Sequence, residues 1–90
     1  MYNFKFTPDT SAYASKDKEF ILMFIRTNER YINEVFKVKG YMYVSTIYEL
    51  FGVKWDAENR DNLCRIYREG CPPIKLMLHE LSDGYEIYID

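Results

Sequence analysis

The chain has 90 residues, enough for one small domain spanning residues 1–90 and too few for a second hydrophobic core. Twelve Lys and Arg against fourteen Asp and Glu give a net charge of −2, and 48% of the residues are hydrophobic, which excludes a disordered chain. No apolar run approaches the roughly 20 residues of a membrane span, and neither a signal peptide nor a disulfide framework is expected, so we expect a cytoplasmic protein.

Aromatic side chains stand at every second position at the start of the chain, from Tyr2 to Phe6. This alternation predicts a short edge strand or a loosely packed arm within residues 1–14. Pro8 ends the alternation, and polar turn residues follow it.

A long helix is expected next. Ser15 is a suitable N-cap, apolar residues then recur at helical spacing, and Gly40 is a natural stop. The pattern predicts a helix over residues 16–37, with a kink near Thr27. Its phenylalanines are expected in the core: Phe20, Phe24 and Phe36.

Residues 41–44 are aromatic and β-prone, which predicts a short strand. Ser45 can then cap a short helix over residues 46–51, closed by Gly52. The β-branched residues of this segment also fit a strand that continues through Tyr48. The sequence leaves both alternatives open for residues 43–48.

Capping signals predict a further helix over residues 56–69. Asp56 suits the N-cap, arginines stand in the last turn, and Gly70 follows. Two consecutive prolines, Pro72 and Pro73, forbid its continuation.

The C-terminal segment has the pattern of a β-hairpin. Residues 74–81 and 85–90 alternate between apolar and polar side chains. The dipeptide Asp83-Gly84 between them is typical of a two-residue turn, in which both central residues need positive φ.

Together these elements predict an α+β domain. The expected order is a long N-terminal helix, a short strand, a helix-turn-helix-like pair and a C-terminal β-hairpin. This is the order of a winged helix-turn-helix, with the hairpin as the wing, although another small α+β layer would also fit.

Residues 40–52, GYMYVSTIYELFG, resemble a segment common in small uncharacterised proteins of bacteriophages and prophages. The matching positions are Gly40, Tyr41, Val44, Tyr48, Leu50 and Gly52. The resemblance implies a phage or mobile-element origin and action in a bacterial cytoplasm. It implies no activity and no site residues.

Metal and catalytic sites are not expected. The only soft ligands are Cys64, Cys71 and His79, and the two cysteines stand further apart than the roughly two to four residues usual in zinc sites. Nucleophile and phosphate-loop motifs are absent from the sequence. We therefore expect no catalytic residue, no metal, no cofactor and no enzymatic activity.

DNA binding is the alternative function. The expected helix over residues 56–69 would enter the major groove. It carries residue types that read bases and phosphates: Asn59, Arg60, Asn62, Arg65 and Arg68. Acids in the same segment match these cations, and the hairpin that would form the wing is acidic, so the charge pattern disfavours nucleic acid.

Binding to a protein partner is the favoured function. Tyrosines concentrate after Gly40, with acids interleaved near the C-terminus. Tyrosine is enriched at interfaces because it buries a large area with few torsions to freeze. We expect an acidic, tyrosine-rich surface that suits a basic or nucleic-acid-binding partner, such as a host or defence factor that it would inhibit; self-association is equally compatible. The expected residues are Tyr43 (if its strand pairs with the hairpin), Asp83, Glu86 and Tyr88.

Overall fold

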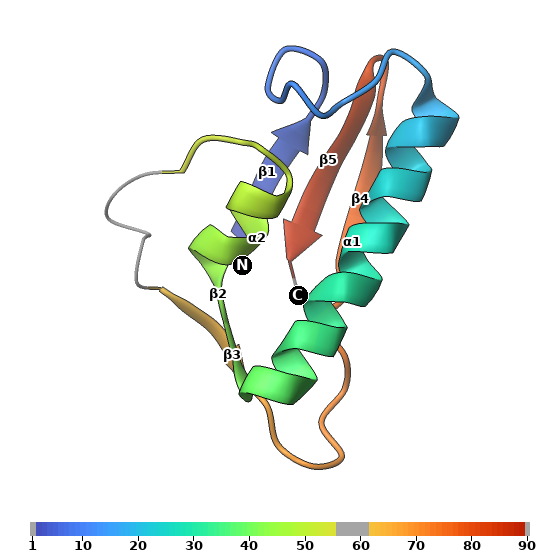
Figure 1. Ribbon diagram of the computed structural model, residues 1–90. Helices are drawn as coiled ribbons and strands as arrows, with labels where there is room; N and C mark the ends of the chain where they lie inside the picture. Colours follow the sequence, from blue (N-terminus) through green and yellow to red (C-terminus); the bar gives the residue numbers. More distant parts are fainter. Residues whose placement is uncertain (1, 56–61, 90) are drawn as a thin grey trace.

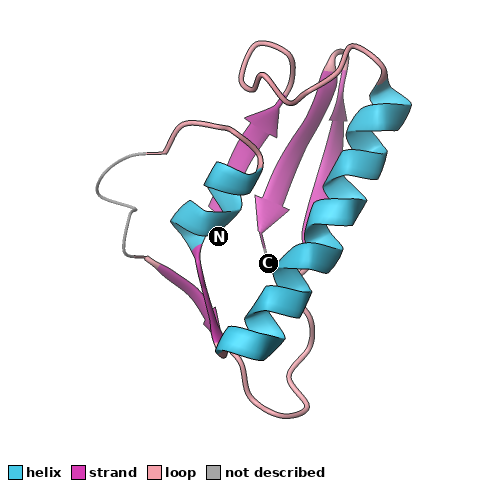
Figure 2. Ribbon diagram, viewed as in Figure 1, coloured by secondary structure: helices cyan, strands magenta, loops and turns pink. Residues whose placement is uncertain are grey.

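The computed structural model describes residues 2–55 and 62–89. In chain order its elements are β1 (Tyr2–Phe6), α1 (Lys18–Lys39), β2 (Tyr41–Tyr43), α2 (Val44–Leu50), β3 (Leu63–Ile66), β4 (Leu76–Leu81) and β5 (Gly84–Ile89). Helices and antiparallel sheets make an α+β fold, which confirms the expected class (Figure 2). A helix at the N-terminus is not supported, because β1 precedes α1. Among the described residues no helix is long and apolar enough to cross a membrane.

Three strands form an antiparallel sheet in the order β1-β5-β4. Tyr2 pairs with Ile89 and Phe6 pairs with Tyr85, so the first strand lies beside the last (Figure 1). The two helices lie on one face of this sheet (Figure 1). The buried side chains of the sheet include Phe4, Phe6, Leu76, Ile87 and Ile89. The fold therefore has two layers around one core.

The hairpin between β4 and β5 is present, but its turn is shifted by one residue. Leu81 pairs with Gly84, so Ser82 and Asp83 are the turn residues, and neither has positive φ. Gly84 is needed for another reason. A Cβ atom there would overlap the carbonyl oxygen of Phe6 in β1. The expected tip at Asp83-Gly84 is therefore wrong, and the glycine lets β1 approach β5 closely.

Capping interactions define both ends of α1. Asp17, not the expected Ser15, is the N-cap, and its carboxylate accepts a hydrogen bond from the Glu19 N–H at 2.9 Å. Gly40 has a φ of 86°, and its N–H donates to the Phe36 carbonyl at 2.9 Å. Only a residue without a Cβ adopts this φ freely, so Gly40 ends the helix.

The core face of α1 is narrower than the sequence predicts. The buried side chains are Ile21, Ile25, Ile32 and Phe36. Phe20 is 62% exposed and Tyr31 is 50% exposed, so the expectation of a core position for Phe20 is wrong. A helix presents only a stripe of its surface to the core, and the residues listed as buried already fill that stripe.

Residues 41–50 divide between a strand and a helix. The strand β2 stops at Tyr43, and α2 begins at Val44, so a strand through Tyr48 is wrong. Ser45 is buried inside α2 rather than capping it; the N-cap position belongs to Tyr43, which makes no side-chain cap. Tyr43 is thus the last residue of β2, and residues 44–48 are helical.

The expected helix over residues 56–69 is wrong where the structure describes that segment. Leu63–Ile66 form β3, which pairs antiparallel with β2. Residues 56–61 lie outside the described part of the chain. A short strand such as β2 leaves its backbone groups unpaired unless a second strand joins it, and this pairing outweighs local helix signals. The winged-helix order is consequently not confirmed.

Aromatic rings fill the core between α2 and the sheet. The Phe6 ring lies 5.3 Å from Phe24 and 5.1 Å from Phe51, measured between centroids. Phe4 lies 4.9 Å from Tyr48 in an edge-to-face contact. These offset and edge-on geometries are the favoured ones for aromatic pairs. Part of the high aromatic content therefore belongs to the core.

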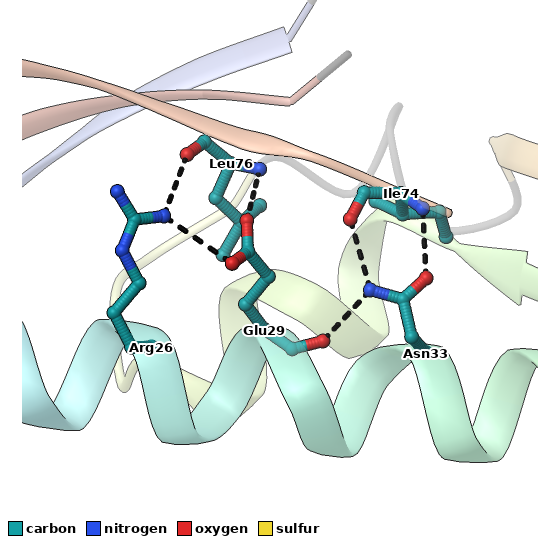
Figure 3. A network of polar contacts seen from close by, with 5 residues as sticks. All are labelled: Arg26, Glu29, Asn33, Ile74 and Leu76. Atoms are coloured by element: carbon teal, nitrogen blue, oxygen red, sulfur yellow. Dashed lines mark hydrogen bonds and ion pairs between the residues drawn. The ribbon is translucent and has the colours of Figure 1, made fainter. Parts of the chain in front are cut away.

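Side chains of α1 bond to the outer edge of β4 at its first residue, Leu76, and to Ile74 just before the strand (Figure 3). Asn33 bonds to both backbone groups of Ile74: its Oδ1 accepts from the N–H at 2.7 Å, and its Nδ2 donates to the carbonyl at 2.9 Å. Glu29 accepts from the Leu76 N–H at 2.8 Å, and Arg26 donates to the Leu76 carbonyl at 3.4 Å. The bonds to Leu76 occupy groups that an added strand would need at the start of β4.

Side chains also reach the opposite edge of the sheet, along β1. The Tyr48 hydroxyl donates to the Asn3 carbonyl at 3.2 Å, and the Thr10 hydroxyl donates to the Lys5 carbonyl at 2.6 Å. The chain itself thus covers part of both edges of the three-stranded sheet.

Candidate functional site

The two-stranded ribbon of β2 and β3 presents apolar side chains on one side. Tyr41 lies opposite Ile66, and Tyr43 lies opposite Leu63; an irregularity in the register between Met42 and Tyr43 accounts for the three-residue spacing of Leu63 and Ile66, so that both cross-strand pairs share a face. The two tyrosine rings contact each other edge to face, with 5.4 Å between centroids. Exposure runs from 38% for Tyr43 to 52% for Ile66. We call these four residues the ribbon face.

The other side of the ribbon packs against the core. Met42 is 2% exposed, and Cys64 is half-buried. Burial raises the pKa of the Cys64 thiol above its usual value, against a smaller opposing effect of the Arg65 charge. The thiol therefore stays protonated at neutral pH and is a poor nucleophile. Apolar residues on both sides distinguish this ribbon from an antiparallel sheet with one solvated, polar face.

The solvent side of the three-stranded sheet is mostly polar. Register places Asn3, Tyr88 and Met77 in one row across the strands. The next row consists of Lys5, Glu86 and His79. We call these six residues the sheet face. It contains two of the four residues expected to bind a protein, Glu86 and Tyr88.

Glu86 is the centre of a hydrogen-bonded group on the sheet face. Asn3 donates from Nδ2 to one carboxylate oxygen at 3.0 Å, and the Tyr88 hydroxyl donates to the other at 2.9 Å. The hydrogen bond to Glu86 raises the pKa of Tyr88 above its usual value, because losing the proton would break the bond and place two negative charges together. Both oxygens of Glu86 are therefore already engaged.

The four expected protein-binding residues do not form one surface. Asp83 is exposed in the turn at the end of the hairpin that carries Glu86 and Tyr88. Tyr43 lies on β2, whose partner is β3 and not the hairpin. The condition for adding Tyr43 to the acidic surface is thus not met.

Of the five residues expected to read DNA, the three that the structure describes do not lie on a helix. Asn59 and Arg60 lie outside the described residues. Asn62 precedes β3, where its carbonyl accepts from the Val44 N–H at 2.9 Å. Arg65 lies within β3 and donates to the carbonyls of Pro72 and Pro73 at 2.7 and 3.2 Å, and Arg68 is exposed after the strand. Arg65 holds the following loop against the ribbon.

The soft metal ligands come from separate elements. Cys64 lies in β3, Cys71 in the loop that follows it, and His79 in β4 on the sheet face. Within residues 2–55 and 62–89, no three His, Cys, Asp or Glu side chains gather closely enough to hold a metal ion.

A groove of about 1010 Å³ runs between α1 and β4. Its lining includes the cations Arg30, Lys37 and Lys75, together with the edge-covering residues Glu29 and Asn33. Because Glu29 bonds to Leu76, the first residue of β4, and Asn33 bonds to Ile74 just before it, the groove offers no free backbone groups at these two residues.

Sequence reasoning missed Leu63 and Ile66, which were assigned to a helix. One signal pointed to them: a strand as short as β2 requires a partner, and the segment before Pro72 contains β-compatible residues.

A scan against protein-family models found no match for this chain, and searches of curated proteins and of solved structures found none either. The resemblance of residues 40–52 to phage proteins therefore stays a prediction.

Proposed function

We propose that this protein is a non-enzymatic binding module that contacts a protein partner through the ribbon face. The observation that carries the proposal is the exposure of two tyrosines and two aliphatic side chains on one side of a thin ribbon. Tyrosine gives an interface a rigid apolar ring and a hydroxyl that can stay hydrated before binding. Apolar groups grouped in this way favour association more than scattered ones do.

The partner that fits this surface has a complementary apolar patch with acceptors for the tyrosine hydroxyls. A basic partner is supported only at the hairpin turn, where Asp83 is exposed. Elsewhere on the hairpin Glu86 is hydrogen-bonded, and Glu80 forms an ion pair with Lys18 at 2.6 Å. A phage origin, a bacterial cytoplasmic location and inhibition of a host factor belong to the same proposal, supported by the resemblance of residues 40–52.

Affinity capture from a bacterial lysate tests the proposal when paired with surface variants. The variant Tyr43→Ser with Ile66→Ser should lose a partner that the wild type retains. Met77→Ser is the matched control, because Met77 is 43% exposed and apolar but lies on the sheet face. A captured protein is then purified and titrated against all three chains.

Retention of the partner by the ribbon variant, or loss of it by the Met77 variant, would place the interface elsewhere. Duplex DNA at low salt is the parallel test. Micromolar binding that collapses as salt rises would favour a nucleic-acid function instead.

A further inference from the structure

The groove between α1 and β4 has no part in the proposed ribbon interface. Its volume is about 1010 Å³, and none of the ribbon-face residues lines it. One wall is the side of α1 that carries Arg30, Glu34 and Lys37, and the other wall is the chain over residues 73–78. The groove is therefore a second surface, on the opposite flank of the core, that is available to a ligand.

Positive charge predominates along this groove. Its lining contains four cations and two acids: Arg26, Arg30, Lys37, Lys75, Glu29 and Glu34. Arg26 and Glu29 form an ion pair with each other at 3.2 Å and also bond to β4. The other four side chains are exposed, and none of them forms an ion pair with a residue that the structure describes. Three such cations face one such acid, so the groove attracts negatively charged groups.

The edge of β4 offers backbone groups in the same groove. Leu76 directs its N–H and C=O toward α1, where Glu29 and Arg26 bond to them (Figure 3). Leu78 stands two residues further along β4, so its backbone groups point to the same edge, and it also lines the groove. Within the described part of the chain, no residue bonds to the Leu78 groups at this edge. An extended segment can therefore pair with β4 at Leu78.

We propose that this groove binds an extended acidic segment of a protein partner, which pairs with Leu78 and forms ion pairs with Arg30, Lys37 and Lys75. Arg30 and Lys37 are seven residues apart on α1, a separation of about 10 Å at 1.5 Å per residue. An extended peptide repeats its side chains on one face about every 7 Å. Two acids on one face of the segment therefore lie within reach of both long side chains.

A nucleic acid fits the groove less well than a peptide. It carries a negative charge at every phosphate, and so it meets the carboxylate of Glu34 wherever it follows the α1 wall. A peptide can place its carboxylates only where the cations lie. Its backbone also has both the donor and the acceptor that the Leu78 groups require, whereas the sugar-phosphate chain has no N–H donor for the Leu78 carbonyl.

Fluorescence anisotropy with a labelled peptide tests the chemistry of the ligand. The probe is a peptide of alternating threonine and glutamate, about eight residues long. The full chain should bind it at least about tenfold more tightly than the same peptide with glutamine in place of glutamate, and added salt should weaken the binding. Absence of binding, or equal binding of both peptides, overturns the proposal. An oligothymidylate of equal charge that binds more tightly than the acidic peptide overturns it in favour of nucleic acid.

Charge variants locate the site on the molecule. Arg30→Gln combined with Lys37→Gln should raise the dissociation constant of the acidic peptide at least about tenfold. Lys16→Gln combined with Lys39→Gln is the matched control, because it removes the same charge from exposed residues near the two ends of α1, outside the groove. Glu34→Gln should tighten binding several-fold. Circular dichroism verifies that each variant is folded. Equal weakening by the two double variants would mean unspecific attraction and would overturn the site.

The backbone pairing has a readout of its own. Amide hydrogen exchange at Leu78 should slow at least about tenfold when the acidic peptide saturates the chain, and an unchanged rate would contradict pairing at β4. The ribbon variant Tyr43→Ser with Ile66→Ser should bind the peptide as the wild type does. This result would separate the groove from the ribbon face, whereas loss of binding in that variant would place the peptide on the ribbon and overturn the proposal.

Discussion

The three-stranded sheet and the two-stranded ribbon differ in how far the chain covers their edges and outward faces. In the sheet, Glu29 and Arg26 bond to one edge, Tyr48 and Thr10 bond to the other, and the solvent side is mostly polar. The ribbon has only one pair of strands and turns Tyr41, Tyr43, Leu63 and Ile66 outward. Within the chain, side chains cover part of both sheet edges, whereas the outward face of the ribbon leaves apolar groups exposed to water.

The sheet and the ribbon also differ in the aromatic residues that they carry, while elsewhere Tyr48 of α2 is buried and Phe20 of α1 is exposed. Phe4, Phe6 and Phe51 are buried beside the sheet, whereas Tyr41 and Tyr43 are exposed on the ribbon. A phenyl ring gains only from burial, but a phenol can hold water at its hydroxyl until a partner replaces that water. The aromatic content therefore serves the core in one region and surface contact in the other.

Substitution of Gly84, where β5 approaches β1 closely, should have the largest effect on stability. Gly84→Ala places a methyl group against the Phe6 carbonyl, so β1 must move away from β5. We expect a loss of about 3 kcal/mol in the free energy of unfolding, measured by urea denaturation. Ser82→Ala in the adjoining turn is the control and should change it by less than about 0.5 kcal/mol. Equal stability of the Gly84 variant and the wild type would show that the contact is relieved without cost.

Removal of the Asn33 side chain should have the second-largest effect on stability. Asn33→Ala leaves both backbone groups of Ile74 without their present partner, which should cost about 2 kcal/mol. The uncovered backbone of Ile74, next to the start of the edge strand β4, should also promote aggregation on warming, measured by light scattering. Lys37→Ala, one turn further along α1 and exposed, is the matched control. If the two variants behave alike, the edge bonds contribute nothing to stability or solubility.

The ribbon face should contribute little to stability. Leu63 is 42% exposed, so Leu63→Ala should lower the free energy of unfolding by less than about 1 kcal/mol. Ile87→Ala in the sheet is the contrast: Ile87 is fully buried, and its truncation should cost about 3 kcal/mol. Similar losses for both would mean that the ribbon face is part of the core, which would remove the basis for the proposed interface.

The smallest expected effect is the pH dependence of stability that is linked to Tyr88. The folded protein holds the phenolic proton of Tyr88 more tightly than the unfolded chain does, so its pKa is raised. The associated stability is fully present below the ordinary tyrosine pKa of 10.0 and is lost as pH rises through the higher folded value. Ultraviolet titration of the phenolates should show a late-titrating component that Tyr88→Phe removes and Glu86→Gln shifts to lower pH. An unchanged curve for Glu86→Gln would exclude Glu86 as the cause.

The parts of the fold that depend on local signals were predictable from the sequence. Alternating residues identified β4 and β5, and helical periodicity with Gly40 identified α1 to within a few residues. The fold class follows from these elements. Glu86 and Tyr88 were placed on one outward face because alternation alone determines which strand side chains share a side.

The errors concern non-local interactions. Helix-capping signals at Asp56 and Gly70 flank the segment that contains β3, and its pairing with β2 makes Leu63–Ile66 a strand. Gly84 looked like a turn residue, but its constraint comes from Phe6, at the other end of the chain. Phe20 fits the helical period yet falls outside the width of surface that the core can cover. None of these constraints is present in a local window of sequence.

The position of β5 at the centre of the sheet has a consequence for the order of assembly. Asn3 and Glu86, joined by a hydrogen bond, are 83 residues apart, and β5 is the last strand of the sheet to be synthesised. Until it emerges from the ribosome, β1 has no neighbour and its phenylalanines have no sheet to pack on. Contacts this distant along the chain slow folding. We therefore expect the nascent chain to expose the apolar rings of β1 until β5 is available. A chaperone should then have a larger effect on the nascent chain than on the folded protein.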